Sequence, residues 1–295
     1  MLTNEQIRHT GPAILNYRPL PAPGMFHKSP AKFRWIFGGN RSGKSESNIG
    51  YDLCAFALGV HPFRETLKNA VIWAAANTWP LVGKLLWMEK IQRYMPAGQI
   101  GDIVWHNRAE EIPKEVRLVN GNRTEFKAYE QGRKSFEGRA IDAFYGDEQC
   151  KSDAETIWTE IQARLMDKHG FSAQSMTPII HQAWLEERIK SLPDSDFITY
   201  ANLNDNRKSR DGYVDDREID LMISQWPEEV RETRIKGHFA AFQGAVYKLF
   251  SRDTHVIKPF EIPESWDQGH RFRFQQSVRV PVAGQGSRQA MVPLR

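Results

Sequence analysis

Cysteine is scarce in this sequence. Cys54 and Cys150 are the two cysteines among 295 residues, and they lie far apart along the chain. Metal sites and redox motifs built from cysteine place their ligands a few residues apart. The sequence therefore excludes a cysteine zinc ribbon or a dithiol redox centre, and we expect both thiols to be structural and free of a disulfide.

Long apolar runs are also missing. No stretch approaches the roughly 18 apolar residues of a membrane-spanning helix, and residues 1–5 lack the regions of a signal peptide. We therefore expect a cytoplasmic protein without a membrane partner. Its 40% hydrophobic and 26% charged residues are ordinary for a globular fold, and its net charge of +4 permits a polyanionic partner without identifying one.

Acidic residues end before the C-terminus. Beyond Asp267 neither Asp nor Glu occurs, whereas residues 270–295 contain five arginines. Nucleases that use two metal ions hold them with several carboxylates. We therefore expect a disordered basic tail here, without such a nuclease centre.

A phosphate-binding loop follows the apolar run 33–37. It matches the pattern G-x-x-x-x-G-K-[ST] and consists of Gly38, Gly39, Asn40, Arg41, Ser42, Gly43, Lys44 and Ser45. In such loops the backbone N–H groups surround nucleotide phosphates, the lysine reaches the β and γ phosphates, and the hydroxyl ligates Mg²⁺. The predicted ligands are ATP and Mg²⁺.

The residues around this loop predict a parallel α/β fold. A β-rich segment at 34–37 precedes the loop, and apolar residues recur with helical spacing at 46–58. A second strand at 69–76 and an amphipathic helix at 79–95 continue the alternation. Between residues 100 and 129 shorter alternating runs, with a turn at 120–122, indicate antiparallel strands at an edge.

An acidic pair ends a further short strand at 140–148. Asp147 has the position of a carboxylate that holds magnesium through water, and Glu148 that of a base that orients the attacking water. We expect this strand to neighbour the strand before the loop. A solvated strand end is the alternative interpretation, and Gly146 interrupts the apolar run.

Two further segments contain candidate site residues. A glycine-punctuated basic turn at 132–139 places Arg133 and Arg139 where an arginine could reach a phosphate of its own or a neighbouring subunit; an ordinary solvated loop is the alternative. Ser175 and Thr177 precede Pro178, where a hydroxyl at a strand end can sense the γ phosphate.

The order of these motifs resembles the large subunit of tailed-bacteriophage terminases, the ATPase that drives DNA into the procapsid. The resemblance spans residues from about 17 to 267. It rests on the loop with Arg41, on residues 135–138 leading to Asp147 and Glu148, on residues 175–178, and on the segments 244–250, 255–257 and 262–266.

The resemblance implies a role for each candidate residue. In an ASCE-type P-loop ATPase, Lys44 and Ser45 would contact phosphate and metal, Arg41 would lie near the γ phosphate, Asp147 would hold Mg²⁺ and Glu148 would be the catalytic base. Ser175 and Thr177 would match the motif that couples hydrolysis to DNA movement. Some members use an arginine before the conserved glycine, but Glu137 occupies that position here, so Arg133 and Arg139 become the candidate arginine fingers.

The resemblance also implies partners. The expected ones are double-stranded DNA, a portal protein, a small terminase subunit and identical copies in a ring, usually a pentamer, docked on the procapsid in the host cytoplasm. Family members continue into an RNase H-like nuclease, which a lost frame or a split gene would remove near residue 267. Two alternatives are a P-loop helicase of non-viral role and a truncated ATP-binding protein without turnover.

The predicted organisation has four parts. Residues 1–30, rich in proline, form an extended arm anchored by Tyr17, Met25 and Phe26, which in such proteins often covers the nucleotide base. The P-loop ATPase core occupies 31–204, and a small lid or linker subdomain occupies 205–250. Ile219, Met222, Ile223 and Trp226 suggest a packed lid helix there. Residues 251–295 hold the start of the truncated nuclease region and the basic tail.

Overall fold

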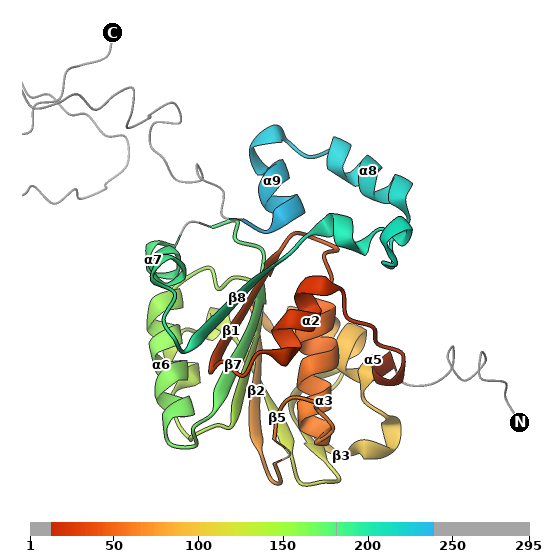
Figure 1. Cartoon of the computed structure of the whole chain (residues 1–295). Helices are drawn as coiled ribbons and strands as arrows, with labels where there is room; N and C mark the ends of the chain where they lie inside the picture. Colours follow the sequence, from red (N-terminus) through yellow and green to blue (C-terminus); the bar gives the residue numbers. More distant parts are fainter. Residues whose placement is uncertain (1–12, 66, 181, 239–295) are drawn as a thin grey trace, which may run out of the picture. The chain divides into compact units, whose positions relative to one another are not determined.

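The fold is built on one mixed sheet. The computed structural model describes residues 13–65, 67–180 and 182–238, within which eight strands lie in the order β3-β4-β5-β2-β6-β7-β1-β8 (Figure 1). The strands are β1 (Phe33–Gly38), β2 (Val71–Ala76), β3 (Ile100–Asn107), β4 (Ile112–Leu118), β5 (Arg123–Ala128), β6 (Ala143–Asp147), β7 (Phe171–Met176) and β8 (Asp196–Ala201). Pairing from β5 to β8 is parallel, whereas β4 is antiparallel to β3 and β5. The predicted α/β fold with antiparallel additions is confirmed.

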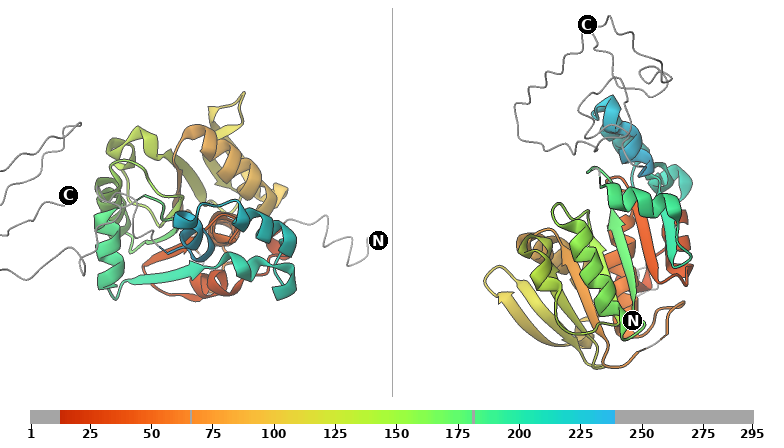
Figure 2. Two further views of the ribbon diagram at one scale, coloured as in Figure 1. Left: turned by 90° about the horizontal axis from the view of Figure 1, so that it is seen from above. Right: turned by 90° about the vertical axis from the view of Figure 1, so that its left-hand side faces the viewer.

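Helices cover both faces of this sheet (Figures 1 and 2). One face carries α2 (Pro21–Lys28), η2 (Glu46–Leu53), α3 (Cys54–Leu58), α4 (Trp79–Leu81), η3 (Val82–Ile91) and α5 (Gln92–Tyr94), and the other carries α6 (Ala154–Met166) and α7 (Ala183–Ser191). Every residue of β1 and β2 is buried, as expected for parallel strands between two helical layers. The helices predicted at 46–58 and 79–95 are both present.

Short 3₁₀ turns link these elements, and none of the described helices is long and apolar enough to cross a membrane. The turns are η1 (Ala13–Leu15), η4 (Ala97–Gln99), η5 (Tyr129–Gln131), η6 (Arg133–Phe136), η7 (Leu203–Asn206) and η8 (Lys208–Arg210). Cys54 is buried and Cys150 half-buried, and both are free thiols, as expected.

The proline-rich N-terminal segment is not an extended arm throughout. Residues 21–28 form helix α2, and Pro21 occupies the first helical position, where its missing N–H costs no hydrogen bond. Phe26 is fully buried, in agreement with its predicted role as an anchor. Met25 is 53% exposed, so the prediction that it is an anchor is wrong. Residues 1–12 of the predicted arm lie outside the described residues.

Two helices follow the sheet. Of the residues that predicted a packed helix here, Ile219, Met222 and Ile223 lie on α8 (Asp216–Ser224), where only Ile219 is fully buried, and Trp226 lies beyond its end. A second helix, α9 (Glu228–Lys236), precedes Gly237. The end of α9 packs directly on the phosphate-binding loop: a Cβ added to Gly39 would lie 1.5 Å from the carbonyl oxygen of Arg234. Glycine at position 39 is therefore required by this contact. The tail at 251–295 lies outside the described residues.

A buried ion cluster joins the helix behind the loop to the sheet. Asp52 of η2 accepts two hydrogen bonds from the guanidinium of Arg34 in β1, at 2.8 and 2.9 Å, and both side chains are fully buried. His27 Nδ1, His61 Nε2 and the hydroxyl of Tyr145 complete its surroundings at 2.7, 3.1 and 2.9 Å. The nearby arginine holds the pKa of the Asp52 carboxyl well below its ordinary value although burial alone would raise it.

Removing the Asp52 charge should destabilise the fold strongly. Asp52→Asn leaves the Arg34 charge buried without a counter-charge, so we expect the free energy of unfolding to fall by about 3–5 kcal/mol. Urea denaturation measures this loss. Glu232→Gln, which removes an exposed partner of Lys236, is the control and should leave the urea midpoint unchanged; equal effects of the two substitutions would contradict the assigned role.

Candidate active site

The phosphate-binding loop has the backbone shape that its motif requires. Arg41 and Gly43 adopt left-handed conformations with φ of 63° and 84°, and the Ser42 hydroxyl donates to the carbonyl of Gly39 at 2.8 Å. The helix begins directly behind the loop, since the N–H of Ser47 donates to the carbonyl of Gly43. Successive backbone N–H groups at a helix N-terminus form an anion site.

Lys44 and Glu148 meet at this loop. The Lys44 ammonium lies 2.9 Å from Glu148 Oε1, with 6% of the lysine side chain and 39% of the glutamate side chain exposed. The two candidate residues come from segments about a hundred positions apart in the sequence. The structure therefore brings the loop and the acidic pair to one place.

The strand of the acidic pair is not a neighbour of β1, contrary to our prediction. β7 lies between β1 and β6 and pairs in parallel with both. The residues still converge because parallel strands end at one edge of the sheet, so that the loops after β1, β6 and β7 meet there. Ser175 on the intervening strand donates to Asp147 Oδ1 at 2.6 Å.

Asp147 is buried in an unfavourable place for a charge. Burial raises the pKa of its carboxyl, and the neighbouring Glu148 raises it further, while Lys44 and hydrogen bonds from Ser175 and Ser45 oppose the shift. The Ser45 hydroxyl is thus a neighbour of the Asp147 carboxyl. A carboxylate and a hydroxyl are oxygen donors of the kind that Mg²⁺ prefers, so these residues fit that ion.

Glu148 has a strained backbone. Its φ is 64°, a left-handed conformation that is uncommon for a residue with a side chain. Its N–H donates to the Ser175 carbonyl at 2.8 Å, and its Oε2 accepts from the Thr177 N–H at 3.3 Å. Thr177 in turn donates through its hydroxyl to the carbonyl of Gly38 at 2.8 Å. Ser175 and Thr177 therefore contact both the acidic pair and the loop.

Asn48 and Gly146 also shape the site. The buried Asn48 amide donates to the Gly146 carbonyl and to the Ser175 hydroxyl, both at 2.9 Å, and so ties the helix of the loop to β6 and β7. Sequence reasoning missed Asn48, although an amide beside apolar Ile49 on the inward side of a helix was a signal. Gly146 lies inside β6, and glycine is needed at this position because a Cβ there would lie 2.6 Å from the Tyr129 hydroxyl.

The candidate arginines Arg133 and Arg139 are exposed and form ion pairs with carboxylates outside the acidic pair. Arg133 is 3.0 Å from Glu137 and 3.5 Å from Glu160, and Arg139 is 3.4 Å from Glu125. Arg41 is exposed in the loop, and its backbone carbonyl accepts from Asn206.

A second group of potential metal ligands, around Asp52, already has a positively charged partner. His27, Asp52 and His61 present their ligand atoms within 4.8 Å of one another. The Arg34 guanidinium occupies both oxygens of Asp52, and this fixed positive charge opposes a cation. These residues therefore form an ion-pair cluster and not a metal centre.

Comparison with known proteins identifies the family. Residues 35–249 match the family model of the terminase large subunit, T4-like-virus type, N-terminal part. This chain belongs to that family. It is therefore a terminase ATPase domain, part of the motor that packages phage DNA.

Solved structures share this fold. A variant of the large terminase ATPase domain of Thermus phage P74-26 has a TM-score of 0.55 at 17% identity, over 80% of this chain and 98% of that one. The large terminase of a thermophilic bacteriophage, in complex with ADP, has a TM-score of 0.58 at 14% identity, over 83% of this chain and 60% of that one. This chain thus spans 60% of the length of the ADP-bound terminase. No curated protein sequence matches it.

Because the charge of Asp147 is buried, we predict that removing it stabilises the protein by an amount that depends on pH. Because the fold raises the pKa of this carboxyl, its ionised form costs stability at a pH above that pKa, and the cost disappears as protonation occurs at lower pH. Asp147→Asn should therefore raise the melting temperature of the ligand-free protein at pH 8, with a gain that shrinks toward pH 5.

Thermal denaturation over this pH series measures the effect. Asp167→Asn, an exposed substitution at the end of α6, is the control. A gain for Asp147→Asn that does not change with pH would show that the buried charge is not its cause.

Proposed function

We propose that this terminase domain hydrolyses ATP with Lys44 on the β and γ phosphates, Ser45 and Asp147 on Mg²⁺, and Glu148 as the base. The observation that carries the proposal is the 2.9 Å contact between Lys44 and Glu148 beside the buried Asp147. An ammonium, a metal-binding carboxylate and a second carboxylate at one helix N-terminus form the set that phosphoryl transfer to water requires.

In the proposed mechanism the lysine changes partner. ATP phosphates compete with Glu148 for the Lys44 ammonium, which releases the carboxylate to accept a proton from the attacking water. The loop N–H groups and Arg41 stabilise charge on the γ phosphate during transfer. Mg²⁺, when bound by Ser45 and Asp147, neutralises charge on the phosphate oxygens.

The base of ATP has a suitable cavity beside the loop. A cavity of about 370 Å³, within the usual size range of ligand sites, lies between the N-terminal segment around α2 and the helix that follows the loop. It is lined by Tyr17, Pro19, Leu20, Pro21, Gly24, Met25, His27, Lys28, Tyr51 and Phe63. Leu20 adjoins the loop, because its Cδ1 lies 3.2 Å from where a Cβ of Gly43 would be. We place the adenine there.

We assign the coupling of hydrolysis to DNA movement to the end of β7, which contacts both the acidic pair and the phosphate-binding loop. Ser175 and Thr177 contact Asp147, Glu148 and the loop carbonyl of Gly38. Loss of the γ phosphate alters the charge that these residues face, and so shifts the segment behind them. DNA is held through its phosphates without sequence preference, so binding weakens steeply with salt.

The proposed assembly is a ring, a pentamer as in the family, that acts with a portal protein and a small terminase subunit. The side chains of Arg133 and Arg139 are 56% and 54% exposed, which supports a role for one of them in a neighbouring subunit's site. We retain residues 1–30 as a cover for the base, 31–204 as the catalytic core and 205–250 as a lid, followed by a separate C-terminal region at 251–295.

Two substitutions separate binding from turnover. Lys44→Ala removes the ammonium and should abolish both ATP affinity and hydrolysis. Glu148→Gln keeps the shape of the site without the base, and should lower kcat by about 10²–10⁴-fold while ATP still binds. Phosphate release and fluorescent-nucleotide binding measure the two quantities.

Glu155→Gln, on the exposed first turn of α6, is the matched control and should retain full activity. Normal turnover by Glu148→Gln would remove this residue from the mechanism. ATP binding without turnover by the unchanged protein, with and without DNA and across a concentration series, would favour the non-catalytic alternative.

Filling the cavity tests the position of the base. An added Cβ at Gly24 has open space, its nearest contact being 3.8 Å away on Pro19, and α2 tolerates a better helix former than glycine. Gly24→Leu should raise the KM for ATP at least about 10-fold by blocking base contacts, and leave tripolyphosphate binding unchanged. Gly24→Ala is the control with little effect. Equal loss of ATP and tripolyphosphate binding in Gly24→Leu would refute this placement.

A further inference from the structure

The residue after the acidic pair, Gln149, is clamped to the segment behind the coupling hydroxyls. Its amide makes two opposed hydrogen bonds with the backbone of Ile180: Nε2 donates to the carbonyl at 2.6 Å, and Oε1 accepts from the N–H at 2.9 Å. Gln149 is 5% exposed. A buried amide with both ends paired in this way has one orientation, because a flipped amide would oppose donor to donor and acceptor to acceptor.

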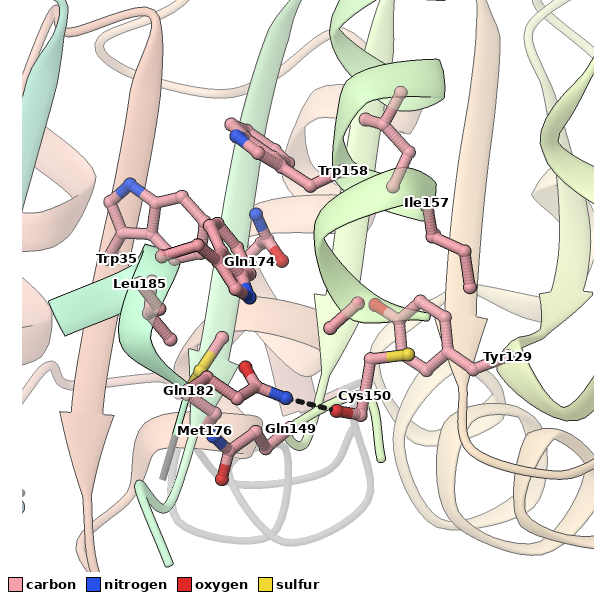
Figure 3. Close-up of a pocket in the computed structure, with 13 residues that line it drawn as sticks. Trp35, Tyr129, Gln149, Cys150, Ile157, Trp158, Gln174, Met176, Gln182 and Leu185 are labelled. Atoms are coloured by element: carbon pink, nitrogen blue, oxygen red, sulfur yellow. Dashed lines mark hydrogen bonds between the residues drawn. The ribbon is translucent and has the colours of Figure 1, made fainter. Parts of the chain in front are cut away.

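A second amide extends this connection. Gln182 Nε2 donates to the carbonyl of Cys150 at 2.6 Å, as Figure 3 shows. Together with the bonds from Glu148 to Ser175 and Thr177, these contacts extend the connection of β6 and β7 beyond their last strand pair, Asp147 with Ser175, to Ile180 and Gln182. The residues that follow β6 are thus held to those that follow β7 mainly by the amide side chains of Gln149 and Gln182.

The small cavity beside these amides does not account for them. It has a volume of about 20 Å³, enough for a single water molecule, and its walls are mostly apolar side chains of β1, α6 and α7 (Figure 3). A nucleotide or cofactor is far larger than this space. The amide of Gln149 therefore serves the backbone beside the cavity and not a ligand inside it.

The two hydrogen bonds between the Gln149 amide and the Ile180 backbone, which we call the clamp, explain how Glu148 keeps a strained conformation. A left-handed φ of 64° persists in a non-glycine residue only where its surroundings over-determine it. The bond from its N–H to Ser175 holds one side of Glu148, and the buried Gln149 amide holds the other. The direction of the Glu148 carboxylate toward Lys44 depends on this backbone.

We propose that Gln149 is a positioning residue that fixes Glu148 for water activation and transmits its position to Ile180 and the segment leading to α7. The proposal rests on the proposed role of Glu148 as the base. A shift of Glu148 on phosphate release pulls on Ile180 through the amide, so turnover and movement of this segment are linked through one side chain.

Isosteric substitution tests the proposal. Gln149→Met keeps the length of the side chain and removes both hydrogen bonds, so it should lower kcat by about 10- to 100-fold through misplacement of the base. The KM for ATP and fluorescent-nucleotide affinity should stay within about twofold, because the loop is untouched. Gln174→Met is the matched control: Gln174 is also buried beside the cavity, and its Nε2 has no protein partner within the described residues. It should keep near-normal kcat.

A charged variant gives a readout that simple packing would not produce. Gln149→Glu can accept from the Ile180 N–H, but it donates to the Ile180 carbonyl only when its carboxyl is protonated. Burial near Glu148 favours protonation. The ratio of its kcat to that of the parent protein should therefore rise as pH falls from 8 to 6, whereas the ratio for Gln149→Met stays constant.

The outcomes separate this inference from the proposed function. Glu148→Gln without turnover, combined with near-normal kcat in Gln149→Met, would overturn the clamp and leave the function standing. Equal losses of kcat in Gln149→Met and Gln174→Met would also overturn it, and so would a ratio of kcat values for Gln149→Glu that does not change with pH. Either result would mean that Gln149 contributes only through packing. Normal turnover of Glu148→Gln would instead contradict the proposed function itself.

Discussion

The pair of Arg34 and Asp52, fully buried behind the phosphate-binding loop, fixes the frame on which the site depends. Asp52 lies on the helix that begins at the loop, Arg34 on the strand that ends there, and Tyr145 on the strand that leads to the acidic pair. Because a buried charge without its partner is costly, these three elements cannot separate independently. The loop and the acidic pair therefore have a fixed spacing before any nucleotide binds.

A second set of polar contacts, at the carboxyl ends of the strands, also fixes the spacing between the loop and the acidic pair. Asn48, Ser175 and Thr177 connect the loop helix, β6 and β7 through side-chain bonds to backbone carbonyls and to Asp147. The site keeps two carboxylates close together, at a cost that is visible in the raised pKa of Asp147. Burial and like charge both disfavour the ionised form of Asp147, and a cation bound there would offset them. This is the electrostatic basis of the proposed magnesium site.

The features of the fold and the site that could be predicted from the sequence are mostly those that depend on residues close together in the chain. The loop motif, the strand and helix around it, and the acidic strand end are local signals, and they identified Lys44, Asp147 and Glu148, which the structure brings together. The order of strands was not accessible in this way. Buried parallel strands such as β1 and β2 all appear as short apolar runs, so nothing in them shows that β7 separates β1 from β6.

Other features depended on contacts between distant segments. Proline favoured an extended arm where Pro21 in fact opens a helix. Gln149 looked like an ordinary polar residue after a strand, because its partner Ile180 lies about thirty positions away. The reason for Gly146 was likewise invisible without the Tyr129 hydroxyl that leaves no room for a side chain.

The contact of α9 with Gly39 constrains one position of the loop beyond what the motif requires. The motif leaves this position open to any residue, yet here the Arg234 carbonyl excludes even a methyl group. The nucleotide-binding surface and the helix that follows the sheet therefore share a boundary without intervening side chains. Because backbone meets backbone at this point, a shift of the loop toward α9 cannot be absorbed by a side-chain rotation and requires the helix itself to move.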